Sequence, residues 1–444
     1  MKSLRSSIYR NAAYGIFVFV VGASMIIFTK SPIAFLWFIG LLCLVEVGSY
    51  FLVCFVRKNF PWFIMPKDFF PPIDKQGLKE FIKHGYDSEL GWVRKPLTQK
   101  DEIGQNGSRT QYTINAFGGR SNPGHEELKS LISCYGDSFT FCRQVNDHET
   151  FEWYLSKITK TNVLNFGVGN YGLDQSILRL FREYPSNKTK IVIMGVVPST
   201  IVRILCVWKH YNEFGNALGF KPRFQFSAEG IELVRNLIDT EEKLDHYKDF
   251  ISEINKYDEF YETKFKKEML GFPYFISIMA DPMRNISIIA MVLWRKFLNK
   301  GKKGQPYPPA MKVIMDRNLK LRVSLFNKNR EAVALLQQLI EKFIEYGKKN
   351  DFTPVFLWMP QKDDILHIRE KKDVFYGQFI SQIQEKLVTI DLTDLILHYE
   401  ELDELYSDDN QYGGHHTKKA NSIIADFINT TLMQRGIYEN KQIK

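Results

Sequence analysis

The N-terminal part of the chain carries two long runs of apolar residues, at positions 12–28 and 33–56. Each run is close to the roughly 20 residues that an α-helix needs to cross the hydrocarbon core of a bilayer. The first run is long for a signal peptide, and no small-residue cleavage site follows it before the second run begins. The pattern therefore predicts a transmembrane hairpin of two helices over residues 1–58.

Glu46 interrupts the second apolar run. A carboxylate is costly inside a bilayer, and such a residue can be functional. The interpretation that we favour is a contact between helices, or a side chain that reaches toward the membrane surface.

Basic residues flank the hairpin at both of its ends and are scarce at its tip. Those outside the tip are Lys2, Arg5, Arg10, Arg57 and Lys58, and only Lys30 lies in the loop between the runs. Positively charged flanks stay on the cytoplasmic side. We therefore expect a protein of the inner (plasma) membrane whose large C-terminal domain faces the cytoplasm.

After residue 130, short uncharged runs alternate with amphipathic segments. Strands are predicted at 131–135, 162–166, 191–197, 355–359 and 388–392, and helices at 149–158, 174–183, 331–348, 373–387 and 417–433. Such alternation is typical of a parallel sheet with helices on both faces. The predicted fold is α/β, a three-layer α/β/α (flavodoxin-like) domain over 130–444, with its site at the carboxyl ends of the strands.

Two segments depart from that alternation. Residues 59–129 are weakly patterned and predict a linker that ends in a first strand near 111–115. Residues 227–305 predict a helical insertion, highly charged up to Glu268 and apolar beyond it. We expect its apolar part to pack on the core or on the hairpin, with the membrane surface as the alternative.

Composition narrows the classes of partner. The net charge is +9, but no dense Lys/Arg stripe tracks along the chain, so we expect no nucleic acid and favour anionic lipid headgroups. The five cysteines have neither disulfide nor metal spacing, and no phosphate-binding loop is present. We therefore expect no metal and no cofactor.

A first candidate for chemistry is Ser138, in the run YGDSFT at 135–140. It follows a predicted buried strand, and Gly136 allows a sharp turn. A serine there exposes its hydroxyl at the top of the sheet, where backbone N–H groups face developing negative charge. The alternative is that Asp137 and Ser138 only cap a helix.

A serine nucleophile needs a base, and the run SDDNQYGGHHT at 407–417 offers one. A histidine just before the last helix can reach the same sheet edge as Ser138, and Asp408 and Asp409 could orient it. The alternatives are a surface histidine pair or adventitious metal binding.

These blocks, taken in order, resemble the SGNH/GDSL hydrolase family. The resemblance covers the YGDSFT run, NFGVGNYGLDQ at 165–175, MGVVPST at 194–200 and GGHHTKKAN at 413–421. It implies that Ser138 is the nucleophile and that His415, rather than His416, is the base. The family's Asp two or three residues before the base is absent here, since Tyr412 and Gly413 stand there. Asp408 or Asp409 then replaces it, or no Asp does.

The resemblance also implies an oxyanion hole. Ser138 contributes its own N–H, and the second block contributes that of Gly169 or Asn170. The third block has no Asn, so Ser199 or Thr200 is expected to stand in for the missing side-chain donor. Loss of one such donor typically costs on the order of 100- to 1000-fold in rate.

Arg203 and Arg223 belong to an aromatic and basic stretch after the third strand. They could bind an anionic group of the substrate, or the stretch could be a packed loop on the rim.

The predicted function is a serine esterase for acyl esters, including O-acetyl esters, of carbohydrate or lipid-linked glycan. Water resolves the acyl-enzyme, or a sugar hydroxyl does if the protein is an acyltransferase. The carbohydrate part follows the resemblance alone. Two alternatives remain: a catalytically idle binding module in a membrane polysaccharide assembly, and an esterase that acts on lipids.

Overall fold

The computed structural model describes residues 32–103, 109–297, 308–407 and 414–438, together with Gly15, Val20, Val21 and Ser24. Most of the first apolar run lies outside the described residues, so the two-helix hairpin stays a prediction. The chain divides into two compact units, one from Met1–Pro72 and Glu259–Asp316 and the other from Ile73–Asp258 and Arg317–Lys444.

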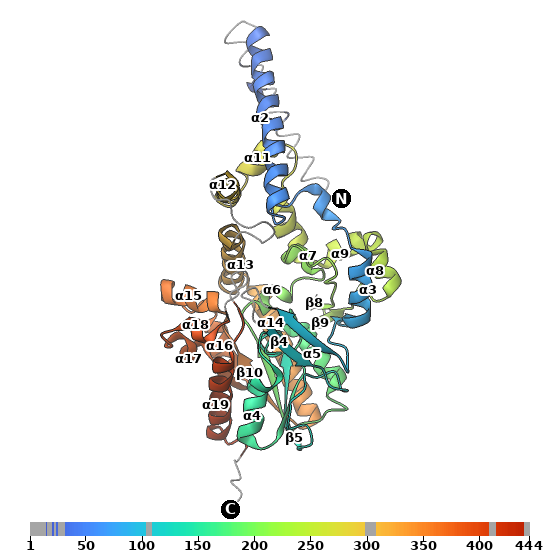
Figure 1. Ribbon diagram of the computed structural model, residues 1–444, viewed down its shortest axis with the longest axis vertical. Coiled ribbons are helices and arrows are strands. Elements are labelled where there is room, and N and C mark those ends of the chain that lie inside the picture. Colours follow the sequence, from blue (N-terminus) through green and yellow to red (C-terminus); the bar gives the residue numbers. More distant parts are fainter. Residues whose placement is uncertain are drawn as a thin grey trace, which may run out of the picture. The chain divides into compact units, whose positions relative to one another are not determined.

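The second unit is built on a five-stranded sheet in the order β11-β10-β7-β5-β6, in which every pair of neighbours is parallel (Figure 1). The strands are β5 (Ser130–Gly136), β6 (Asn162–Asn165), β7 (Ile191–Val196), β10 (Thr353–Trp358) and β11 (Val388–Asp391). The five predicted strands are confirmed, and so is the three-layer α/β/α fold. The order reverses between β5 and β7, which is where such sheets place their ligands.

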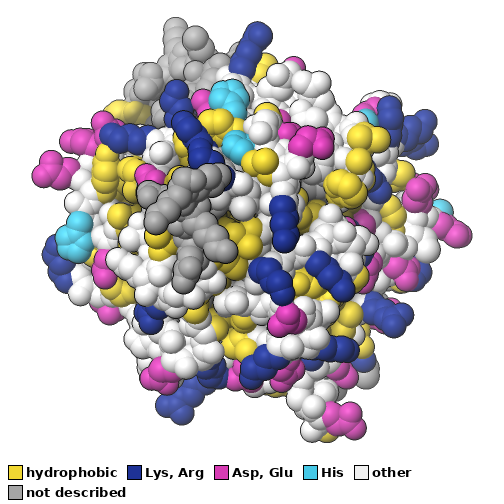
Figure 2. All heavy atoms as spheres, turned by 90° about the horizontal axis from the view of Figure 1, so that it is seen from below, with side chains coloured by type: hydrophobic (Ala, Val, Ile, Leu, Met, Phe, Trp, Pro, Cys, Tyr) yellow, Lys and Arg dark blue, Asp and Glu magenta, His cyan; other side chains and the backbone are white. Residues whose placement is uncertain are grey.

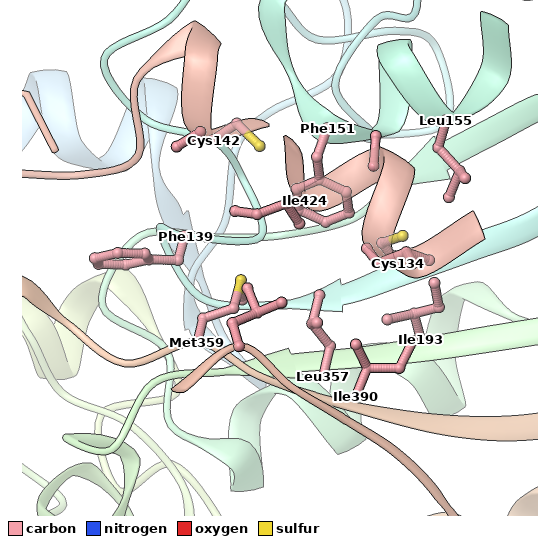
Figure 3. Packing of buried hydrophobic residues seen from close by; sticks show 14 of the residues in the cluster. Cys134, Phe139, Cys142, Phe151, Leu155, Ile193, Leu357, Met359, Ile390 and Ile424 are labelled. Carbon is pink, nitrogen blue, oxygen red and sulfur yellow. The ribbon is translucent and has the colours of Figure 1, made fainter. Parts of the chain in front are cut away.

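Alternate residues of the strands pack on opposite faces of the sheet, because successive side chains of a strand point to opposite sides. Cys134, Ile193 and Leu357 join one core with Phe151 and Leu155 of a helix (Figure 3). The long helices around the sheet are α4 (Phe151–Thr159), α5 (Leu173–Glu183), α14 (Arg330–Asn350) and α19 (Lys418–Gln434). Helices α4 and α19 pack together over that core, whereas α5 and α14 contact each other and the sheet's other face.

Two strands approach closely where the site is built. A Cβ added to Gly136 would lie 2.0 Å from the carbonyl oxygen of Gly195 on β7 and 2.2 Å from Oγ1 of Thr140. The Thr140 hydroxyl donates to that same carbonyl, at 2.9 Å. The contact holds the turn after β5 against β7, and it leaves no room for a side chain.

We expect Gly136→Ala to destabilise the protein by roughly 3 kcal/mol, because backbone and Thr140 would both have to shift. Chemical unfolding followed by circular dichroism measures the effect. Gly377→Ala is the matched control, since its Cβ would meet only Val374 at an ordinary 3.6 Å. Equal stabilities of the two variants would contradict the tight contact.

The remaining helices of the second unit are mostly short. They are α3 (Lys75–His84), η2 (Asp147–Glu149), α6 (Thr200–Arg203), α7 (Lys209–Asn212), α8 (Glu241–Asp245), η3 (Tyr247–Phe250), α9 (Ile251–Tyr257), α15 (Lys362–Lys371), α16 (Gly377–Gln384), α17 (Thr393–Leu397) and α18 (Leu402–Leu405). Helix α13 (Pro308–Lys328) is shared between the two units.

Three two-stranded antiparallel pairs complete the second unit. They are β1 (Tyr86–Asp87) with β2 (Gly91–Trp92), β3 (Gln99–Ile103) with β4 (Arg109–Thr113), and β8 (Arg223–Ser227) with β9 (Gly230–Val234). In its described residues, the segment predicted as a linker therefore carries the short helix η1, the helix α3 and four strands. The segment predicted as a helical insertion is mainly helical over its described residues, 227–297, except at its start, where β9 pairs with β8.

The first unit is helical in its described part. It contains α2 (Pro32–Asn59), η1 (Pro66–Phe69), the π-helix η4 (Tyr261–Phe265), α10 (Lys266–Glu268), α11 (Tyr274–Met279) and α12 (Pro282–Phe297). Val53, Val56 and Phe60 form a core with Ile288 and Ile289 of α12. The apolar part of the insertion thus packs on the second predicted membrane helix.

Helix α2 is the one helix in the described part of the chain that is long and apolar enough to cross a membrane, over Ile33–Asn59. Only 17% of its apolar window is buried, unlike a helix inside a soluble core. A signal sequence would pass the same test of length and composition.

On the face shown in Figure 2, Lys and Arg side chains are interspersed with Asp and Glu side chains. A protein that tracks a phosphate backbone presents a continuous basic stripe instead. The expectation of no nucleic-acid partner stays a prediction.

Candidate active site

Ser138 lies in the turn that leaves the carboxyl end of β5. The Asp137 carboxylate accepts from the Phe139 N–H at 2.8 Å, and the Asp137 carbonyl accepts from the Phe141 N–H at 2.9 Å. The turn is therefore closed by its own hydrogen bonds. Ser138 is 5% exposed, so the residue is largely buried.

The structure brings Ser138 and His415 together from positions far apart in the sequence. Nε2 of His415 lies 2.9 Å from Oγ of Ser138, which is hydrogen-bonding distance for a nucleophile and its base. His415 precedes α19, whose N-cap is Thr417. The Phe139 ring packs on the His415 ring with their centroids 4.9 Å apart.

The other nitrogen of His415 meets an amide that the sequence did not single out. Nδ1 of His415 lies 2.9 Å from Oε1 of Gln144. The same Oε1 accepts from the backbone N–H of His415 at 3.0 Å and from the Ser407 hydroxyl at 2.6 Å. A backbone N–H can only donate, so the atom facing it is the amide oxygen. Nδ1 therefore carries the proton and Nε2 is free to accept one from Ser138.

Arg120 holds the loop that carries Gln144. Its guanidinium donates to the carbonyls of Phe141, Cys142 and Val145 at 2.7, 2.8 and 2.6 Å, and pairs with Asp147 at 2.8 Å. Both Cys142 and Gln144 have positive φ, 55° and 73°. Such left-handed positions are costly for residues other than glycine, and they persist where the surroundings fix them. Arg120 therefore positions the loop.

Burial sets the protonation state of the base. Burial first, and the positive charge of Arg143 next, hold the pKa of His415 well below its usual value of 6.5. Among the described residues the acceptor at Nδ1 is a neutral amide, so it offers no negative charge to oppose this. His415 is thus a neutral base near pH 7, and in the described part of the chain no carboxylate contacts Nδ1 to stabilise the imidazolium that forms when it takes a proton.

His416 points away from this chain of contacts. It is 1% exposed, its ring packs edge-on to Phe139 at 4.8 Å, and within the described residues neither ring nitrogen has a hydrogen-bond partner. The structure thus separates the two histidines, and His415 is the one that reaches Ser138.

Burial lowers the pKa of His416 to about 3, from a usual 6.5. The unfolded chain takes up a proton near pH 6.5 that the folded protein excludes, so stability is complete above that pH and falls as the pH decreases toward about 3. Between about pH 7 and about pH 4, the wild-type protein should lose on the order of 3 kcal/mol of stability through His416. His416→Phe should not show this loss. Urea unfolding at both pH values measures it.

His148→Phe, at an exposed position, serves as the control for that substitution. If His416→Phe loses as much stability on acidification as the unmodified protein, the buried imidazole does not exclude a proton as described.

The glycine-rich second block comes close to Ser138. A Cβ added to Gly169 would lie 4.0 Å from Cβ of Ser138, so the second block returns to the nucleophile. Within the described part of the chain, the N–H groups of Ser138 and Gly169 have no protein acceptor. Asn170 has a positive φ of 68°, and Trp92 fixes the carbonyl of Gly169 through its indole N–H at 2.9 Å.

The two candidates for the side-chain donor differ. The Thr200 hydroxyl accepts from the Leu173 N–H at 2.9 Å and so caps α5. Oγ of Ser199 is buried and, among the described residues, has no hydrogen-bond partner. The Thr200 hydroxyl is held against α5 but keeps its own proton to donate, whereas Ser199 is not held by such a bond, and the oxyanion role of either stays a prediction.

Both arginines that were expected to bind substrate form hydrogen bonds or ion pairs within the protein. Arg203 pairs with the buried Asp137 at 2.8 Å and donates to the Tyr171 carbonyl at 3.0 Å. Arg223 donates to the carbonyls of Leu205 and Tyr257 at 2.9 and 2.8 Å. Arg223 is therefore part of the packing, and Arg203 braces the turn of Ser138. Substrate contact by either remains a prediction.

Asp408 and Asp409, the predicted orienting carboxylates, lie outside the described residues. Sequence reasoning missed Gln144, because no spacing marks an amide that becomes a partner only when its loop folds back on residue 415. In the described ranges, no group of three or more His, Cys, Asp or Glu side chains could hold a metal ion.

No protein-family model and no curated protein matches this sequence. Solved structures that match include a G-D-S-L family lipolytic protein from Desulfitobacterium hafniense, 10% identical, which covers 68% of this chain and 99% of its own at a TM-score of 0.30. A lipase/acylhydrolase from Enterococcus faecalis is 11% identical, covering 71% and 100%, also at 0.30. A mutant acetylxylan esterase from Geobacillus stearothermophilus is 12% identical, covering 73% and 100%, at 0.31. These likenesses are distant, so the case for an activity rests on this chain's own residues.

Proposed function

We propose that this protein is a serine esterase in which Ser138 is the nucleophile and His415 the general base. One observation carries the proposal: the continuous chain of contacts from Oγ of Ser138 through His415 to Oε1 of Gln144. It supplies a base at hydrogen-bonding distance in the tautomer that proton transfer requires.

The reaction follows from those atoms. Nε2 of His415 takes the proton of the Ser138 hydroxyl while Oγ attacks the ester carbonyl carbon. The N–H groups of Ser138 and Gly169 stabilise the oxyanion, with Ser199 as an added donor. The imidazolium returns its proton to the leaving alkoxide, which departs as an alcohol. Water or a sugar hydroxyl then attacks the acyl-enzyme, with His415 again as base.

The substrate that we propose is an acyl ester, such as an O-acetyl ester, of carbohydrate or lipid-linked glycan. Support for the carbohydrate part is the resemblance of the sequence blocks. Helix α2 supports a membrane location, since it is long enough to span and mostly exposed. An ester of a membrane lipid is the alternative substrate.

For the membrane part we propose a two-helix anchor with the catalytic domain on the cytoplasmic side, on the strength of the flanking basic residues. A reporter fused after Lys444 that is active only in the cytoplasm is the expected result. Activity of a reporter that works only outside the cytoplasm would overturn this orientation.

A catalytically idle binding module is the second candidate. Two observations favour it: the described partner of Nδ1 is an amide rather than a carboxylate, and the third block lacks its Asn. Each feature lowers the expected rate without removing the nucleophile or the base.

Turnover of aryl esters tests the proposal. Wild type is expected to hydrolyse p-nitrophenyl acetate, and Ser138→Ala to lose that activity while Ser381→Ala, on the exposed surface of α16, keeps it. Preference for the acetyl over the palmitoyl ester supports a sugar substrate, and the reverse supports a lipid. Absence of turnover by folded wild type with every chain length favours the binding module.

A further inference from the structure

Helix α12 has two apolar faces. One face packs in the core of the first unit through Ile288, Ile289 and Val292. The other is exposed and is formed by Met283 (76% exposed), Ile286 (47%), Ala290, Trp294 (60%) and Phe297 (69%). These positions follow one another at intervals of three and four, so they form a single stripe. A helix that is apolar on both sides is typical of a membrane or of a buried interior.

The exposed stripe extends to the segment before α12. Phe272, Phe275 and Met279 are 54%, 47% and 46% exposed. Helix α12 has no acidic residue, and its last turn carries Arg295 and Lys296. The surface is therefore apolar along most of its length and basic at one end.

Helix α11 docks against the middle of α2. The carboxylate of Glu46 accepts hydrogen bonds from the backbone N–H groups of Tyr274, where α11 begins, and of Phe275. The Tyr274 ring lies 5.2 Å from that of Tyr50. Glu46, the carboxylate inside the apolar run, therefore makes a contact between helices α2 and α11. Glu46 precedes Arg57 by eleven residues, or roughly 16 Å of helix, about half the hydrocarbon thickness of a bilayer.

The basic end of α12 lies at the same level as the basic end of α2. Phe297 stacks on Phe55 with their ring centroids 6.1 Å apart. Phe55 precedes Arg57 and Lys58, the basic residues of the last turn of α2. At the other end of α12, Arg284 donates to the carbonyl of Trp62, just beyond the end of α2. Helix α12 therefore lies across the basic end of α2, and only α11 reaches the middle of that helix (Figure 1).

We infer that α11 and α12 lie at the membrane surface beside the basic end of α2, with the stripe facing the acyl chains and Arg295 and Lys296 among anionic headgroups. The inference rests on the proposed membrane span of α2. The favoured occupant is lipid because the stripe lies at the basic end of that helix, and α11 leads from there to its apolar middle. Apolar aromatic and methionine side chains stabilise such a position through burial of their surface in hydrocarbon.

Spin labels on the full chain test this in vesicles of phosphatidylcholine and phosphatidylglycerol in equal amounts. Cys43 and Cys54 are replaced by alanine, and single labels are placed by Ile286→Cys, Leu44→Cys on exposed α2, and Lys267→Cys on the exposed polar surface of the same unit. We expect oxygen to relax the labels at 286 and 44 several-fold more than a water-soluble nickel complex does. The order is expected to reverse at 267.

A label at 286 that is relaxed mainly by the nickel complex, with the label at 44 in lipid, overturns the inference and leaves the span of α2 intact. A label at 286 that neither agent reaches indicates a protein partner or a second copy, and it overturns the inference too. Labels at 44 and 286 that both contact water reject the membrane span itself. Ester hydrolysis by the same labelled proteins reports on the proposed activity separately.

Discussion

Substitution of His415 by alanine is expected to reduce kcat/KM on p-nitrophenyl acetate by about 1000-fold or more. Nε2 of His415 is the nitrogen that lies 2.9 Å from the Ser138 hydroxyl. Without it the hydroxyl has no acceptor for its proton, and a neutral hydroxyl is a poor nucleophile at pH 7. The oxyanion donors remain, so activity above the background of water should persist.

Two controls separate this loss from misfolding. His148→Ala removes an exposed imidazole and should leave kcat/KM unchanged. Circular dichroism should give the same spectrum for His415→Ala as for wild type. Retention of more than a tenth of the wild-type rate by a folded His415→Ala protein would exclude His415 as the base.

Two substitutions test Gln144 as the partner of His415, one that removes its oxygen and one that keeps it. Gln144→Ala removes the acceptor of the Nδ1 proton, and it is expected to lower kcat by roughly 100-fold to 10000-fold, as loss of the orienting member does in Ser-His sites. Gln144→Glu keeps an oxygen for the three donors and adds negative charge beside the ring. Much or all of the activity should survive in this variant.

The pH profile distinguishes positioning from mere packing. In wild type the pKa of His415 is held below 6.5, so activity should continue below that pH as long as the protein stays folded. A carboxylate at position 144 favours the imidazolium and raises that pKa, so the acid limb of kcat/KM against pH should move to higher pH. Gln384→Glu, on an exposed surface, is the control. An unmoved acid limb in Gln144→Glu would contradict contact between residue 144 and the base.

The sheet was predictable because its strands are buried on both faces. Runs such as 191–197 contain no charge and are rich in β-branched residues, which is what two covering layers of helix demand. The pairs β1 with β2 and β8 with β9 were not predicted, since short strands at a surface carry no such run. For the insertion, the sequence predicted packing on the core or on the hairpin, but the periodicity of one helix did not specify which; Ile288 and Val292 pack against α2.

The candidate site was also predictable only in part. Ser138 and His415 were predictable because each ends or precedes a regular element in a recognisable block. Gln144 was not, because its position depends on a loop that Arg120 clamps from another part of the chain. The sequence shows that Arg203 is charged, but it does not show that Arg203 pairs with the buried Asp137.

The most direct test of the account is covalent labelling of the folded full-length protein with a fluorophosphonate, followed by peptide mass spectrometry. We expect one adduct on Ser138, absent in Ser138→Ala and formed far more slowly in His415→Ala. Folded wild type that takes no label, or that takes it on another residue, would contradict the assignment of Ser138 as the nucleophile.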